Sequence, residues 1–185
     1  GGAFGDAASS AAASSVLWTS AAIDARMCGC PLPAMSNTGS GNQGIVSTMP
    51  LYGAAQVFDT DRETLVRGTA VSCLTAIYIK HNVGNLSTVC GLTVAGTGAA
   101  CGLAYIRGGR RDALVCVLKN MYGNISGMIC DGAKTSCALK AASCVHAACM
   151  ASDFALQGFG LESNNGIVGK DENDTIDYFV RTSNE

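Results

Sequence analysis

Two cysteines in the second half of the chain, Cys130 and Cys137, have the spacing and context of a thiolate site for an inorganic cluster. In one unbroken α-helix, positions seven apart lie about 10.5 Å apart along the axis, too far for two ligands of one compact centre. The chain is therefore expected to bend between them. Asp131 and Gly132 favour such a turn, and Lys134 can offset thiolate charge. Cys90 precedes this segment, separated from it by a stretch rich in small residues.

A second constellation is the polar, glycine-rich stretch from Ser36 to Gly44. Its glycines let backbone N–H groups turn toward a common point, and the N-terminus of a following helix adds its positive dipole end. This combination predicts a cradle for the carboxylate of an amino acid, with side-chain donors from Ser36, Asn37, Thr38 and Ser40. The alternative is an ordinary glycine-rich connector.

Three long segments carry a resemblance to a known family. They are CGCPLPAMSNTGSGNQGI from Cys28 to Ile45, VCGLTVAGTGAACGLAY from Val89 to Tyr105, and NMYGNISGMICDGAKTSCALK from Asn120 to Lys140. All three resemble the iron-sulfur L-cysteine desulfidases, which are relatives of the alpha chain of iron-sulfur L-serine dehydratase. The resemblance extends from about Gly1 to about Gly169.

The resemblance implies a site and a reaction. By it, Cys90, Cys130 and Cys137 hold a four-iron, four-sulfur (4Fe-4S) cluster, and three thiolates leave one iron open to act as a Lewis acid. The implied reaction is β-elimination on L-cysteine, giving pyruvate, ammonia and sulfide without pyridoxal phosphate. The implied substrate-binding residues are Ser36, Asn37, Thr38, Gly39, Ser40, Gly41 and Asn42. The family's catalytic base is a cysteine in an N-terminal region that this sequence does not contain, so the base stays unassigned.

Three alternatives remain open at this point. L-serine dehydration would use the same elimination with hydroxide as the leaving group. A chain without the N-terminal region could instead be a non-catalytic domain that binds a cluster or serves only as structure. Cys101, eleven residues after Cys90, competes as a cluster ligand.

The periodicity of the chain predicts an all-α fold, a compact bundle rich in Ala and Gly with glycine-rich active-site loops. No run of alternating β-branched residues is long enough to predict a sheet. Asp6 is the expected N-cap of the first helix. The expected helices cover residues 6–26, 43–57, 61–80, 93–107, 110–121 and 135–157.

The composition indicates one domain, residues 1–185, that belongs to a larger enzyme. Charged residues make up 14% of the chain and hydrophobic residues 48%, whereas about 25% of a typical soluble domain is charged. We therefore expect part of the surface to be covered by a partner. The missing N-terminal domain and a second copy of this chain are the two candidates.

The ten cysteines point to a reducing compartment, because no signal peptide accompanies them. We expect a cytoplasmic location. A net charge of −2 gives no basic footprint for nucleic acid. Polar residues interrupt the uncharged stretches 27–58 and 83–106 too often for a membrane span.

Several other features favour structural roles. The glycines between Gly96 and Gly102 indicate close helix packing rather than a dinucleotide site. We expect His146 to be at least partly buried in a helix. Core packing is expected for Cys73, Cys116, Cys144 and Cys149. Two roles are open for Asn120, Tyr122, Asn124 and Ser126. Their hydrogen bonds could orient the cluster or the substrate, or they could only complete a turn.

Overall fold

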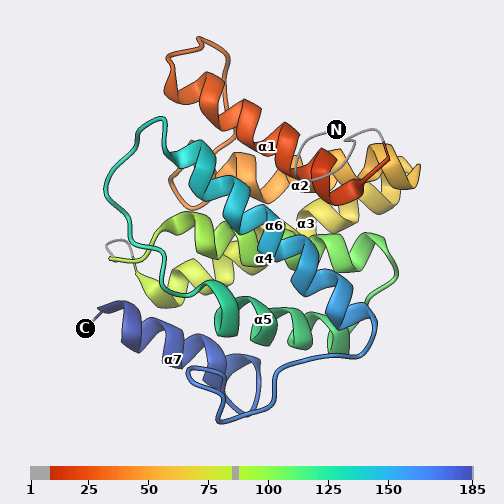
Figure 1. Cartoon of the computed structure of the whole chain (residues 1–185), viewed down its shortest axis with the longest axis vertical. Coiled ribbons are helices and arrows are strands. Elements are labelled where there is room, and N and C mark those ends of the chain that lie inside the picture. The colour runs from red at the N-terminus through yellow and green to blue at the C-terminus, as the bar shows by residue number, and fades with distance from the viewer. Residues whose placement is uncertain (1–8, 85–87, 185) are drawn as a thin grey trace.

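The structure is a computed structural model that describes residues 9–84 and 88–184. These residues form seven α-helices and no strand, so the all-α prediction is confirmed (Figure 1). The helices are α1 Ala11–Met27, α2 Gly41–Phe58, α3 Arg62–Val83, α4 Gly91–Ile106, α5 Arg111–Ile125, α6 Cys137–Leu156 and α7 Glu172–Asn184.

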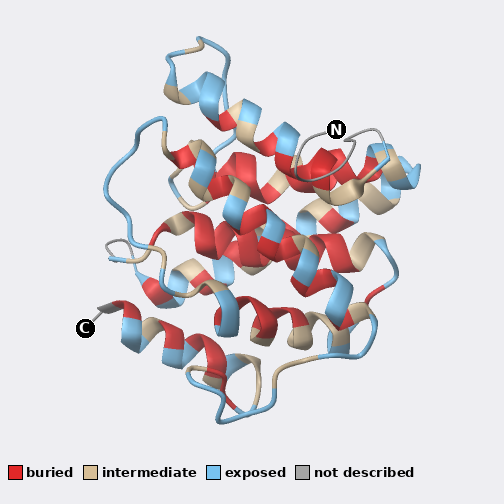
Figure 2. Cartoon of the chain, viewed as in Figure 1, coloured by how far each residue is buried: buried red, intermediate tan, exposed pale blue. Residues whose placement is uncertain are grey.

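Helix α4 is the centre of the bundle. Every residue from Leu92 to Ala104 is buried, and α4 contacts α2, α3, α5 and α6. Figure 2 shows this helix as a continuous buried segment surrounded by helices with exposed outer faces. A helix that is apolar on all sides gains stability only when neighbours cover its whole circumference. The rest of the bundle is therefore arranged around α4.

Glycines allow these neighbours to approach α4 closely. A Cβ atom at Gly98 would lie 2.4 Å from the Ser72 carbonyl oxygen of α3, and one at Gly102 would lie 2.8 Å from the Gly68 oxygen. At Gly96 the nearest neighbour would be the Cys144 Cβ of α6, at 3.2 Å. The glycine pattern is thus a helix-packing motif, as expected.

The N-terminal ends of three helices meet at one end of the bundle. Ser40 caps α2, Cys90 precedes α4, and α6 begins at Cys137. A Cβ atom at Gly91 would lie 2.6 Å from the Gln43 Nε2, so the ends of α4 and α2 are in contact. Figure 1 shows α4 and α6 both beginning on the left of the view. Helix N-termini carry partial positive charge, so this end of the molecule is suited to anions.

Two details at the ends of the chain differ from expectation. Helix α1 begins at Ala11, and its N-cap is Ser10; the expected cap, Asp6, lies outside the described residues. Helix α7 was not among the expected helices because its sequence is mostly polar. It nevertheless packs on the core through Phe179, whose ring lies 4.3 Å from that of Tyr122 between centroids.

The expectation for His146 is wrong, since this residue is exposed on α6. Its neighbours Val145 and Ala147 are buried. Successive residues of a helix point about 100° apart, so buried neighbours in the sequence do not bury the residue between them. Among the described helices, none has the length and apolar character needed to span a bilayer.

Replacing Gly98 with Ala should destabilise the protein. Alanine favours helix by up to about 1 kcal/mol, but its Cβ would lie 2.4 Å from a backbone oxygen of α3, and overpacking typically costs about 1–3 kcal/mol. We expect a net loss of about 1–2 kcal/mol in the free energy of unfolding, measured by chemical denaturation. The control is Gly127→Ala, where no atom lies within 4 Å of the added Cβ. Equal stability of the two variants would contradict the packing argument.

Candidate functional site

A short antiparallel bridge joins the segments that carry Cys90 and Cys130. The Cys90 N–H donates to the Met128 carbonyl oxygen at 2.8 Å, and the Cys130 N–H donates to the Thr88 oxygen at 2.9 Å. Val89 and Ile129 are the paired residues between them. Two segments forty positions apart in the sequence are therefore paired, with Cys90 opposite Met128 and Cys130 opposite Thr88 at the two ends of the bridge.

Cys137 lies close to this pair. It belongs to the same buried apolar cluster as Cys90, with Cys144 also in that cluster. Burial raises the pKa of the Cys90 thiol, and the neighbouring Cys130 and Cys137 raise it further. Cys130 and Cys137 thus both lie within electrostatic reach of Cys90. Cys144 was expected to pack in the core. In the structure it belongs to the same buried cluster as Cys90 and Cys137, so it packs against the candidate site.

An ion-pair network ties the loop between Cys130 and Cys137 to α6. Asp131 pairs with Lys140 and, at 3.1 Å, with Lys134, and the Lys140 Nζ donates to the Ile129 oxygen at 3.0 Å. The Lys140 hydrogen bond is the main cause that lowers the Asp131 pKa to about 2. The network is therefore intact at neutral pH and is lost only as pH falls through about 4 toward 2. Lys140 was missed from the sequence, although its spacing of three from Cys137 on a helix puts both on one face.

The donor set suits an iron-sulfur cluster in type and location. Thiolates are the ligands that such clusters require, and the N-terminus of α6 with two lysines offsets their charge. Within residues 9–84 and 88–184, however, no three His, Cys, Asp or Glu side chains are gathered closely enough to form a ready-made metal site. Cys130 is exposed on its loop, whereas Cys90 and Cys137 are buried. A cluster held by all three cysteines would therefore need their thiols closer together than they lie in this structure.

A tight turn shapes the Ser36–Gly44 loop. Asn37 N–H donates to the Ser40 oxygen at 3.2 Å, and Ser40 N–H donates back to the Asn37 oxygen at 3.1 Å. The two central residues have positive φ, 52° at Thr38 and 82° at Gly39. A β-branched residue in this region is strained by about 1–2 kcal/mol. Strain of this kind is concentrated at functional sites.

Some side chains of this loop are buried in the fold, and others lie at the surface. The Asn37 amide is buried and donates to Ser47 Oγ at 3.2 Å and to the Cys73 oxygen at 3.4 Å. Its Oδ1 is buried without a partner. Ser36 and Gly39 are exposed, and Thr38, Ser40 and Gly41 are half-buried. In this conformation the Asn37 donors serve the α2–α3 contact, positions 36 and 38–41 are at least partly exposed, and Asn42, Gln43 and Gly44 are buried.

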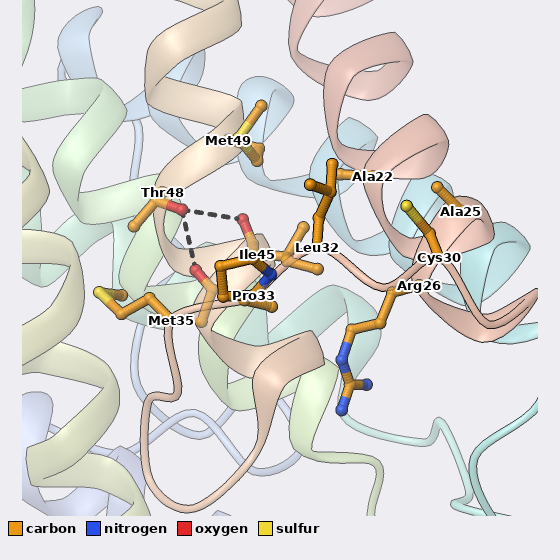
Figure 3. Close-up of a pocket in the computed structure, with 12 residues that line it drawn as sticks. Ala22, Ala25, Arg26, Cys30, Leu32, Pro33, Met35, Ile45, Thr48 and Met49 are labelled. Atoms are coloured by element: carbon orange, nitrogen blue, oxygen red, sulfur yellow. Dashed lines mark hydrogen bonds between the residues drawn. The ribbon is translucent and has the colours of Figure 1, made fainter.

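A cavity of about 290 Å³ lies between the end of α1 and the start of α2. Figure 3 shows Leu32, Ile45 and Met49 lining it, with Arg26 extending away from them at one side. A Cβ atom at residue 44 would lie 1.7 Å from the Met35 oxygen, so only a glycine at this position lets α2 pack against the Met35 backbone beside the cavity. Arg26 was missed from the sequence because no local motif marks it.

Of the remaining candidate residues, Cys101, Asn120 and Tyr122 are buried, whereas Asn124 is exposed and Ser126 is half-buried. Cys101 lies eleven residues after Cys90 along α4, about 16 Å away along the axis, and burial raises its pKa to about 12; it is not a neighbour of the site. Tyr122 is fully buried. Asn120 donates to the Phe159 oxygen at 3.0 Å and accepts from the Leu161 N–H at 3.1 Å, so its side chain fixes the loop after α6.

Comparison with known proteins identifies the family. Residues 3–185 match the serine dehydratase alpha chain family, and the chain belongs to it. A UPF0597 protein of Porphyromonas gingivalis is 47% identical over 160 residues, covering 86% of this chain and 37% of the relative. A UPF0597 protein of Oleidesulfovibrio alaskensis is 48% identical over 153 residues, covering 83% of this chain and 36% of that protein.

The chain therefore spans less than two fifths of the curated relatives it matches. A Clostridium perfringens UPF0597 protein gives the same result, with 44% identity over 86% of this chain and 38% of the relative. No solved structure matches the chain. The suspected family relationship is confirmed at the level of the serine dehydratase alpha chain.

Alkylation of the cysteines should follow burial. Iodoacetamide at pH 8 should label the exposed Cys28 and Cys130 first. Cys101 and Cys144 should label last, because burial raises their pKa values to about 12 and leaves almost no thiolate. Mass spectrometry of peptides at successive times measures the order. Labelling of Cys144 as fast as Cys130 would contradict the described packing.

Proposed function

We propose that this chain is the cluster-binding part of an enzyme that carries out iron-sulfur-dependent β-elimination on L-cysteine. Members of the serine dehydratase alpha chain family are in general iron-sulfur enzymes. The single observation that carries the proposal is the Val89–Ile129 backbone bridge, which pairs the segments of Cys90 and Cys130, while Cys137 shares a buried cluster with Cys90. It brings cysteines distant in sequence to one end of the bundle, close to the start of α2.

Cys90, Cys130 and Cys137 would hold a 4Fe-4S cluster at this end. When bound through three thiolates, such a cluster supplies an open iron that acts as a Lewis acid. Lys134 and Lys140 would offset the thiolate charge. Their ion pairs with Asp131 hold in place the loop that carries Cys130.

The Ser36–Gly44 loop would bind the substrate. Backbone N–H groups at the start of α2 and the Ser40 hydroxyl can hydrogen-bond a carboxylate. The Thr38 hydroxyl donates to the Asn37 oxygen or the Gln43 Oε1 and would have to turn to reach the substrate. The half-buried loop and the buried floor under Cys90 reduce the access of water, which strengthens these contacts. The substrate-binding set remains Ser36, Asn37, Thr38, Gly39, Ser40, Gly41 and Asn42, with Asn37 also supporting the fold.

The reaction would break the Cα–H and Cβ–S bonds of L-cysteine. A base takes the Cα proton, sulfide leaves from Cβ, and 2-aminoacrylate forms. This product tautomerises to an imine, which water hydrolyses to pyruvate and ammonia. We propose that the base comes from a region beyond this chain or from a second copy of it, and that the enzyme works in the cytoplasm.

L-serine is the second candidate substrate, and the family match favours it. The elimination is the same except that hydroxide leaves in place of sulfide. We nevertheless expect L-cysteine to be used with the higher kcat/KM, because the three long sequence motifs resemble the L-cysteine desulfidases. A steady-state assay of pyruvate formation with both amino acids on the anaerobically prepared natural protein decides the point. A higher kcat/KM for L-serine would assign the dehydratase reaction instead.

The cluster assignment makes a prediction about iron content. Cys90→Ser, Cys130→Ser and Cys137→Ser should each lower bound iron and acid-labile sulfide sharply after anaerobic purification, because each removes a thiolate ligand. The matched control is Cys28→Ser, which changes an exposed cysteine outside the buried cluster. Circular dichroism checks that the helical fold is kept. Full iron retention in all three variants would disprove the ligand set.

A further inference from the structure

We infer that Lys140 is a positioning residue that orders the backbone around Cys130 before a cluster is bound. This inference rests on the proposed function and adds to it the residue that prepares the ligand loop. Three observations carry it: the bonds of the Lys140 ammonium on both sides of Cys130, its place on α6 one turn after Cys137, and its proximity to the Cys90 thiol.

The Lys140 ammonium bonds to the residue directly before Cys130 and to the residue directly after it. Its Nζ donates to the Ile129 carbonyl oxygen at 3.0 Å and pairs with the Asp131 carboxylate. A third bond comes from the other side, where the Cys130 N–H donates to the Thr88 oxygen at 2.9 Å. The backbone of Cys130 is therefore held before, at and after the cysteine itself.

The same lysine fixes this loop relative to Cys137. Lys140 follows Cys137 by three positions on α6, so the two side chains share one face of the helix. The Cys137 Sγ lies 3.8 Å from the Gly132 carbonyl oxygen, which adds a weaker contact to the same loop. Figure 1 shows the loop as the long connection between α5 and α6. Only 23% of the Lys140 side chain is exposed, so packing restricts its rotamers.

The charge of Lys140 also acts on the two buried thiols. The hydrogen bond to Asp131 is the main cause that raises the Lys140 pKa, and the charged forms of Cys90 and Cys137 add to it. The ammonium therefore lies within electrostatic reach of both thiols while it is bonded to the loop of the third. A fixed cation at this position favours the thiolate forms that an iron-sulfur cluster requires.

Lys134 provides an internal comparison. It pairs with the second oxygen of the Asp131 carboxylate at 3.1 Å, and its side chain is 49% exposed. This contact lies on one side of Cys130 only, and exposed ion pairs of this kind contribute little to order. Both lysines bring positive charge to the loop, but the two-sided contact belongs to Lys140. The effects of charge and of positioning can therefore be separated.

The contacts of Lys140 predict how the loop behaves when a cluster binds. Because the backbone on both sides of Cys130 is held, the adjustment should be confined to the Cys130 side chain and to residues 133–136. Groups that are ordered before binding lose less conformational freedom on binding. Lys140 should therefore speed assembly of the cluster and slow its loss.

The first test uses the cluster-free natural protein and hydrogen exchange measured by mass spectrometry. Lys140→Met should speed amide exchange in the peptide that covers residues 128–132 about 10-fold, because it removes two bonds to this segment. Lys134→Met should have a clearly smaller effect. The matched control is Lys119→Met, which removes a lysine whose Nζ donates to the Lys170 carbonyl oxygen at 2.9 Å and should leave this peptide unchanged.

The second test reconstitutes the same variants anaerobically with ferrous iron and sulfide. Lys140→Met should slow cluster assembly and speed iron loss to a chelator, each about 10-fold. Lys140→Arg should recover most of both rates, because a guanidinium keeps the charge and has enough N–H donors for both partners. Circular dichroism checks that every variant keeps its helical fold.

The inference is overturned if Lys140→Met leaves the exchange of residues 128–132 at the wild-type rate, or if Lys134→Met has as large an effect. It is also overturned if Lys140→Arg recovers nothing. Failure of the proposed function looks different. In that case the wild type takes up no cluster, while the faster exchange specific to Lys140→Met persists and supports the ordering of Cys130 by Lys140.

Discussion

The close packing of helices around α4 is the constraint on which the rest of the structure depends. Thirteen consecutive buried residues, Leu92 to Ala104, must be covered on all sides. Gly98 and Gly102 allow α3 to approach to backbone contact. Contacts of this kind are short-ranged and intolerant of an added methyl group. They fix the neighbours of α4 in position, and hence fix where those neighbours begin.

The electrostatic character of the candidate site follows from this arrangement. Because α2, α4 and α6 are positioned by their packing, their N-terminal ends meet at one end of the bundle. That end collects partial positive charge, Lys140, Arg26 and three cysteine thiols that can carry negative charge. An anionic cluster and an amino-acid carboxylate are the two ligands that this charge distribution suits. The apolar core thus determines where the polar loops of the candidate site lie.

The family relationship and the structure support each other at different levels. The serine dehydratase alpha chain match covers residues 3–185, and the relatives are more than twice as long as the matched region. The structure adds the backbone bridge between the segments that carry Cys90 and Cys130 and the network around Asp131, neither of which a family match describes. It also separates Asn37, which supports the α2–α3 contact, from the more accessible positions of its loop.

The sequence by itself determined the helices and the local chemistry. Apolar periodicity marked six of the seven helices, and Asp131 and Gly132 marked the turn after Cys130, because both signals are local. Arg26 beside Gly41, Cys144 beneath Cys90 and the burial of the Asn37 amide depended on contacts between segments distant in the chain. The packing of α7 on the core, through Phe179 against Tyr122, is likewise a contact between distant segments. Tertiary structure alone decided these points, because sequence spacing specifies the faces of a helix but not the neighbour each face meets.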